Sequence, residues 1–268
     1  MKVWVATTAL VAFFAVGGWY MWHGDTPYTP PAPTAAAVEK GAAARITAAR
    51  SAAETAPTGS TRVLLVGNSL AYYIGSSFKA IPSVAVLDAA VTACTFPPQI
   101  VGQRIALADG ASLSREPCAP AWESDVVRAF HPSIVFWLDD DPPRGGGTYR
   151  GKPIAPCSAT YDALYERDLR AEIAKLGATG ATVVVTTSAY SGIAGHGDDR
   201  ADDCQNRAKR AAVARSTARL VDLAAFVCPS GHCVTKRNGL VLRPDGFHYE
   251  GPGGEFVARW LLGQVRGT

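Results

Sequence analysis

The chain has 268 residues, of which 48% are hydrophobic and 18% charged, and its formal net charge is +3. These values are typical of a globular fold with an apolar core. No dense Lys/Arg stripe carries interleaved aromatic residues, so nucleic acid is not expected as a partner. The composition leaves the function open.

The N-terminal segment predicts export. Residues 3–22 contain no charge, follow Lys2, and are about long enough to cross the hydrocarbon core of a bilayer. Aromatic residues that favour the membrane interface lie at the far end: Trp19, Tyr20 and Trp22. We expect residues 1–22 to anchor the chain in the cell membrane by a single pass, with the remainder extracytoplasmic. The alternative is a signal peptide cleaved near residues 15–17, which would make the protein secreted.

A linker is expected to follow this segment. Residues 23–36 are rich in proline and predict an extended spacer. Residues 37–56 are rich in alanine and predict a solvated helix or a partly ordered stalk. We therefore assign residues 23–61 to a linker and stalk, and residues 62–268 to the folded domain.

Apolar runs alternate with helical patterns through this domain. Strands are expected at residues 63–66, 84–87, 134–138, 183–187 and 219–223, and helices at 70–80, 119–130, 161–176, 206–217 and 251–262. Continuously apolar strands that are separated by helices indicate a parallel sheet covered on both faces. The predicted fold is a three-layer α/β/α sandwich with a parallel sheet of about five strands.

The six cysteines predict disulfides in an oxidising compartment. Fifteen pairings are possible for six cysteines. Nearest neighbours suggest Cys228–Cys233, and Cys94–Cys118 and Cys157–Cys204 would then close longer excursions. No C-x-x-C pair is present, so a metal site is not expected. His196 lies near several aspartates between residues 198 and 203, which predict a polar loop because no EF-hand spacing is present.

Ser69 is the first candidate catalytic residue. It follows the first apolar run and Gly67-Asn68, at the start of a predicted helix. Ligands of parallel α/β sheets bind beyond the carboxyl ends of the strands, and a helix N-terminus directs N–H groups at a developing oxyanion. Serine is also a common helix cap, and this motif alone does not exclude that simpler role.

A second candidate motif lies just before the last predicted helix. Asp245 precedes His248 by three residues in a loop that contains proline and glycine. At this spacing the carboxylate can hold the imidazole through Nδ1 and leave Nε2 free to act as a base. A lone D-x-x-H is otherwise typical of a surface turn. With Ser69 it supplies the three members of a nucleophilic triad.

The two motifs resemble the first and last blocks of the SGNH/GDSL hydrolases, and the resemblance extends over about residues 62–266. Residues 92–98 (TACTFPP) and 242–254 (LRPDGFHYEGPGG) are similar to segments of the SGNH domains associated with acyltransferase-3 type membrane O-acyltransferases. The resemblance implies a flavodoxin-like sheet and no cofactor. It also implies Ser69 as nucleophile, His248 as general base and Asp245 as the residue that orients it.

Three positions depart from the family pattern. Ala93 replaces the glycine of the second block, and the third block, which usually supplies an asparagine, reads Asp139-Asp140-Asp141. An ionised carboxylate would repel an oxyanion, and loss of one such donor typically lowers turnover by about 10²- to 10³-fold. The oxyanion hole is therefore expected to use the backbone N–H groups of Ser69 and Ala93. Asn68 replaces the usual aspartate and is assigned no role.

The resemblance implies acyl esters of carbohydrate as substrates. The expected function is that of a cell-envelope serine O-acylesterase or O-acyltransferase. A chain with one membrane span would need a separate multi-span membrane acyltransferase to supply an acyl donor from the cytoplasm. The alternatives are an exported lipase or thioesterase with the same triad, and a non-catalytic module that binds glycans.

Overall fold

The computed structural model describes residues 35–92, 94–101, 104–106, 112–114, 116–118, 120–139, 147–192 and 199–267. At its centre is a five-stranded parallel sheet with the order β11-β10-β7-β1-β2. Its strands are β1 (Thr61–Gly67), β2 (Val84–Asp88), β7 (Ile134–Leu138), β10 (Thr182–Thr186) and β11 (Arg219–Val221). Counted along the chain, this is the 2-1-3-4-5 order of flavodoxin-like sheets read from β2.

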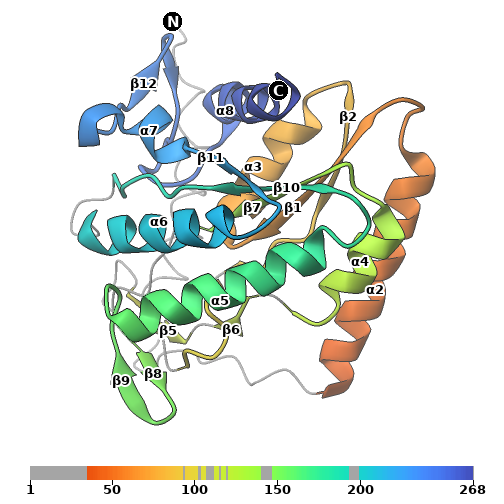
Figure 1. Cartoon of the computed structure of the whole chain (residues 1–268). Coiled ribbons are helices and arrows are strands. Elements are labelled where there is room, and N and C mark those ends of the chain that lie inside the picture. Colours follow the sequence, from red (N-terminus) through yellow and green to blue (C-terminus); the bar gives the residue numbers. More distant parts are fainter. Residues whose placement is uncertain are drawn as a thin grey trace, which may run out of the picture.

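Helices cover both faces of the sheet (Figure 1). One face packs against α2 (Ala35–Thr55), α4 (Glu123–Phe130), α5 (Ala159–Leu176) and α6 (Asp199–Ala214). The other packs against α3 (Ser69–Lys79), α7 (Leu223–Val227) and α8 (Gly251–Arg266). Side chains of β1 alternate between the two cores, with Leu64 on the first face and Leu65 on the second. The predicted three-layer sandwich is therefore confirmed.

Within the described ranges, four small two-stranded sheets were not predicted. They are β3 (Cys94–Thr95) with β6 (Glu116–Pro117), β4 (Arg104–Ala106) with β5 (Ser112–Ser114), β8 (Gly147–Tyr149) with β9 (Lys152–Ile154), and β12 (Lys236–Arg237) with β13 (Leu240–Val241). A short 3-10 helix, η1, spans Pro229–Gly231. Strands of two or three residues are too short to show a period of hydrophobicity, which explains why the sequence does not reveal them.

The folded unit begins before residue 62, where the sequence placed its start. Ala49 of α2 is fully buried in the core of the first face, with Ile46 packed beside it. The guanidinium of Arg45 lies 4.4 Å from the centre of the Trp122 ring, next to α4. The helix α2 is therefore packed on the domain and is not a free stalk, because small side chains such as Ala49 let it approach the sheet closely.

Two helices begin four or more residues away from the predicted start. The helix α6 begins at Asp199 and not at residue 206, so the acidic segment expected to be a loop forms its first turn from residue 199 onward. Acidic side chains at a helix N-terminus interact favourably with the helix dipole. This interaction stabilises the first turn of α6 although the segment is polar. The helix α4 begins at Glu123 and not at residue 119.

Three disulfides are present, with the pairs that nearest-neighbour spacing favoured: Cys94–Cys118, Cys157–Cys204 and Cys228–Cys233. The second joins the segment before α5 to α6, and the third closes the short loop around η1. Across the described ranges, none of the helices combines the length and apolarity that a membrane crossing requires. The anchor expected at residues 1–22 lies outside those ranges.

Candidate active site

Ser69 lies at the carboxyl end of β1, as the first residue of α3. The preceding residue, Asn68, caps this helix, because its Oδ1 accepts a hydrogen bond of 3.0 Å from the Leu70 N–H. Ser69 is the first helical residue, so its own N–H is among the first-turn donors without an acceptor inside the helix. The nucleophile candidate and a backbone donor are thus placed by one turn.

The turn before Ser69 requires glycine. Gly67 has a φ of +127°, and a Cβ at this position would lie 1.9 Å from the carbonyl oxygen of Leu138. Any side chain would push β1 and β7 apart at the point where both strands end. Gly67 therefore lets the chain turn sharply into α3 while the two strands stay paired.

The D-x-x-H loop brings its two residues to Ser69. The Nδ1 atom of His248 lies 2.6 Å from Oδ2 of Asp245, and Nε2 lies 3.1 Å from Oγ of Ser69. The sequence separates Ser69 from His248 by 179 residues. The three side chains therefore form a continuous Asp–His–Ser chain of hydrogen-bond contacts, which is the arrangement required for nucleophilic catalysis.

The carboxylate of Asp245 is held by the loop itself. Its Oδ1 accepts hydrogen bonds from the N–H groups of Phe247 at 2.8 Å and His248 at 2.7 Å. Partial burial raises the pKa of Asp245, but the hydrogen bonds from the His248 N–H, the imidazole and the Phe247 N–H outweigh it and lower the pKa overall. Asp245 is therefore a fixed anion that favours the tautomer with its proton on Nδ1 of His248.

Contacts from neighbouring segments position this loop. The buried Arg243 donates from Nη1 to the carbonyl oxygen of Tyr190 at 2.7 Å, and the Gly192 N–H donates to the carbonyl oxygen of Gly246 at 2.8 Å. After the loop, a Cβ on Gly253 would lie 1.8 Å from the carbonyl oxygen of Val241, so α8 begins against β13 only because this residue is glycine. The motif at residues 242–254 therefore holds the loop in place as well as supplying Asp245 and His248.

A buried polar network lies behind Ser69. Both oxygens of the Asp139 carboxylate accept hydrogen bonds: Oδ1 from Asn68 Nδ2 at 3.4 Å, and Oδ2 from the Tyr165 hydroxyl at 2.9 Å and Gln205 Nε2 at 3.3 Å. Burial, followed by the nearby carboxylate, raises the pKa of Tyr165 well above its usual range, so this hydroxyl keeps its proton and donates it. Asp139 is therefore a structural acceptor.

Lys209 completes the network from α6. Its side chain is fully buried, and Nζ donates to the carbonyl oxygen of Asp139 and to Oγ of Ser188, the latter at 2.8 Å. The side-chain amide of Asn206 spans the Ser188 backbone, accepting from its N–H at 2.6 Å and donating to its carbonyl oxygen at 2.9 Å. The carboxyl ends of β7 and β10 are thus tied together beneath the candidate site.

The structure changes the interpretation of the unusual residues. Asn68 was assigned no role, yet it caps α3 and joins Ser69 to the buried network. Asp139 was expected to be a carboxylate unfavourable to an oxyanion, but both its oxygens are engaged by protein donors. Polar residues inside or just after apolar strands were the available signal for this network. Ala93, Asp140, Asp141 and His196 lie outside the described residues.

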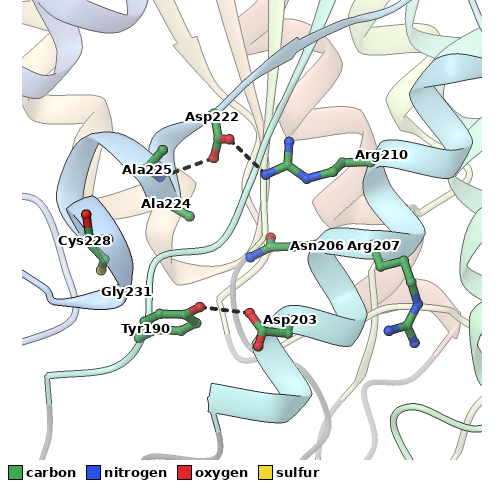
Figure 2. Close-up of a pocket in the computed structure, with 11 residues that line it drawn as sticks. Tyr190, Asp203, Asn206, Arg207, Arg210, Asp222, Ala224, Ala225, Cys228 and Gly231 are labelled. Atoms are coloured by element: carbon green, nitrogen blue, oxygen red, sulfur yellow. Dashed lines mark hydrogen bonds and ion pairs between the residues drawn. The ribbon is translucent and has the colours of Figure 1, made fainter.

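A separate polar pocket lies at the carboxyl ends of β10 and β11 (Figure 2). Its volume is about 380 Å³, and its lining includes none of the three triad candidates. Two contacts join residues of its lining: Arg210 contacts Asp222 at 2.8 Å, and the Tyr190 hydroxyl donates to Asp203 at 2.8 Å (Figure 2). The Asp203 hydrogen bond, with a smaller effect of burial, raises the pKa of Tyr190 to about 12. This pocket is distinct from the Ser69 site.

Comparison with solved structures identifies the fold. A candidate acylhydrolase from Bacteroides fragilis is 12% identical and has a TM-score of 0.50, over 84% of this chain and 95% of that one. A candidate platelet activating factor from Streptococcus pneumonia is 9% identical, with a TM-score of 0.51 over 96% and 100% of the two chains. The chain has the SGNH/GDSL hydrolase fold. A GDSL-like lipase from Bacteroides thetaiotaomicron is 13% identical, with a TM-score of 0.48 over 84% of this chain and 97% of that one.

At these identities the likeness concerns the SGNH fold alone. The chain matches no protein-family model and no curated protein sequence. The chemistry of the site must therefore be argued from its own residues.

Proposed function

We propose that this chain is an extracytoplasmic serine enzyme that cleaves or transfers acyl esters of cell-envelope carbohydrate. The observation that carries the proposal is the chain of contacts from Asp245 through His248 to Ser69, with 2.6 Å and 3.1 Å between the successive polar atoms. An SGNH fold presents these residues at the carboxyl edge of its sheet, where substrates of parallel α/β proteins bind.

The reaction begins when Ser69 Oγ attacks the ester carbonyl carbon and its proton moves to Nε2 of His248. The negative charge on the carbonyl oxygen is stabilised by the Ser69 N–H at the start of α3. Collapse of the intermediate breaks the ester C–O bond, and His248 returns the proton to the departing sugar oxygen. The products of this half-reaction are an acyl-Ser69 and a free sugar hydroxyl.

A second half-reaction regenerates the enzyme. His248 takes a proton from water or from another sugar hydroxyl, and the resulting oxygen nucleophile attacks the acyl-Ser69 carbonyl. Collapse of this intermediate breaks the bond between the carbonyl carbon and Ser69 Oγ, and His248 returns the proton to Oγ. Water gives a carboxylic acid and hydrolysis; a sugar hydroxyl gives a new ester and transfer. For transfer, we propose that a separate multi-span membrane acyltransferase supplies the acyl donor, and that residues 1–22 hold the chain beside it.

The test is hydrolysis of p-nitrophenyl acetate by the full-length chain in mild detergent. Ser69→Ala and His248→Ala are each expected to lower kcat/KM by at least about 10³-fold, because the triad acts as a unit. Arg207→Ala, an exposed substitution on α6, is the control that should leave the rate unchanged. Retained activity in Ser69→Ala would contradict the proposal.

Intact-mass analysis separates transfer from absence of catalysis. If the parent does not turn over, it should still release about one equivalent of nitrophenol per enzyme as Ser69 is acetylated, leaving an acetyl adduct on the parent and none on Ser69→Ala. Such an adduct indicates a transferase that lacks its acceptor. If neither turnover nor an adduct is found, a glycan-binding module replaces the enzyme as the better interpretation.

A further inference from the structure

The helix that begins with Ser69 carries two exposed tyrosines on the same face. Tyr72 and Tyr73 follow Ser69 by three and four residues, the spacing that places side chains next to one another on a helix. Tyr72 is 52% exposed and Tyr73 is 38% exposed. The opposite face of α3 packs into the core through its apolar residues: Leu70, Ala71, Ile74 and Phe78. Neither tyrosine is therefore used to fix α3 to the sheet.

These tyrosines continue an aromatic row that starts at the catalytic loop. The Tyr73 ring lies 4.1 Å from the His248 imidazole, between centroids, with a tilt of 39°. Tyr72 meets Tyr73 edge to face at 5.4 Å, and Phe247 meets His248 edge to face at 5.0 Å. Ring contacts therefore connect Phe247, His248, Tyr73 and Tyr72 in series, and His248 also contacts the Ser69 hydroxyl.

We propose that Tyr72 and Tyr73 bind the sugar ring that carries the scissile acyl group. This inference rests on the proposed function and assigns the sugar part of the substrate to the two tyrosines and its acyl part to Ser69. Tyrosine combines a flat apolar ring with a hydroxyl at its tip, so one residue can cover the C–H face of a pyranose and contact its hydroxyl groups. The acyl carbonyl then lies over Ser69, between the N-terminus of α3 and His248.

The exposure of the row favours a sugar over an acyl chain as its occupant. A long acyl chain gains free energy only in proportion to the apolar area that it removes from water, and a half-exposed surface leaves much of that area wet. A sugar on the same surface keeps its outer hydroxyl groups hydrated. An open row also leaves room for the neighbouring residues of a polymer. The site is accordingly that of a carbohydrate esterase or acyltransferase with a short acyl group.

The experiment compares a sugar ester with simple esters that lack an aromatic or sugar group. Acetate release from glucose pentaacetate and from ethyl acetate, and butyrate release from ethyl butyrate, are measured for the parent, Tyr72→Ala and Tyr72→Phe. The quantity of interest is the ratio of kcat/KM for glucose pentaacetate to that for ethyl acetate. Val241→Ala changes another exposed apolar side chain, 41% exposed on β13, and serves as the control.

Tyr72→Ala is expected to lower this ratio about fivefold, mainly through KM, because loss of one aromatic contact weakens ground-state binding. Tyr72→Phe keeps the ring and should restore most of the ratio, and Val241→Ala should leave it at the parent value. An unchanged ratio in Tyr72→Ala overturns the sugar platform while the proposed ester hydrolysis stands. A selective loss of ethyl butyrate hydrolysis would assign the row to the acyl chain instead. If the parent cleaves none of the three esters and forms no acyl adduct, the proposed function fails.

Discussion

The two regions that meet at Ser69 differ in how far water reaches them. In the loop that follows β13, the side chain of Asp245 is 49% exposed and that of His248 is 18% exposed. Behind Ser69, Asn68, Asp139 and Lys209 are each 3% exposed or less. Water can replace a hydrogen bond lost in the first region but not in the second. The outer region is thus suited to change protonation during a reaction, and the inner one to keep the turn at Ser69 rigid.

The largest expected effect on stability comes from the inner region. Lys209→Met removes one buried donor from the Asp139 carbonyl and one from the Ser188 hydroxyl, although the Ser188 hydroxyl still contacts that carbonyl at 3.0 Å. Each buried hydrogen bond lost in this way costs about 1–3 kcal/mol. We expect urea unfolding to show a loss of about 2–4 kcal/mol, with reduced ester hydrolysis. Arg207→Met, which breaks only the exposed contact with Asp162, should cost less than about 1 kcal/mol. Equal losses in the two variants would remove the contrast between buried and exposed cations.

An exchange of Asn68 and Asp139 tests the link between the network and the nucleophile. Asn68→Asp places two carboxyl groups in buried contact, so one must take up a proton with a raised pKa. We expect a loss of about 1–3 kcal/mol near pH 7, a loss that shrinks as the pH is lowered and the shared proton binds. The double variant Asn68→Asp with Asp139→Asn restores an amide–carboxylate pair and should recover at least half of that loss. If the losses of unfolding free energy from the two substitutions simply add in the double variant, the two residues do not interact.

The smallest expected effect belongs to the outer region. The folded-state pKa of Asp245 is lowered from 3.8, so the folded protein binds this proton less readily than the unfolded chain. Its carboxylate therefore stabilises the fold above about pH 4, and this contribution is lost as the pH falls through the lowered pKa. Asp245→Asn should reduce the unfolding free energy at pH 7 by less than about 1 kcal/mol, because the group is half exposed. The difference from the parent should shrink in unfolding titrations below pH 3.8; a constant difference would contradict this account.

The outer region is expected to matter less than the inner one for stability but more for activity. Asp245→Asn alters stability little, but an asparagine cannot hold the His248 tautomer as a carboxylate does, and a fall in kcat of about 10⁴-fold is expected. The comparison of the two regions therefore predicts variants that fold normally without catalysing, and variants that lose both properties together.

The sequence by itself determined the parts of the molecule that depend on neighbours along the chain. The apolar runs at residues 63–66 and 134–138 specify buried parallel strands, because a strand covered on both faces needs apolar side chains at every position. The turn at Gly67 and the Asp245-x-x-His248 spacing are equally local. The predicted pairing of the cysteines also agrees with the structure, since each bridge joins two cysteines that follow one another in the sequence.

Only the tertiary structure decided the features that depend on distant partners. Asn68 and Asp139 meet across 71 residues, and Lys209 reaches the Asp139 carbonyl across 70, so neither contact has a sequence pattern to reveal it. The packing of α2 depends on small side chains, which allow close contact only where another element such as the sheet lies beside them. The tyrosines of α3 become a candidate binding surface only because His248, brought from the last loop, lies against one of them. Local sequence patterns specify individual helices and strands, whereas the burial of side chains and the pairing of polar groups depend on how those elements pack together.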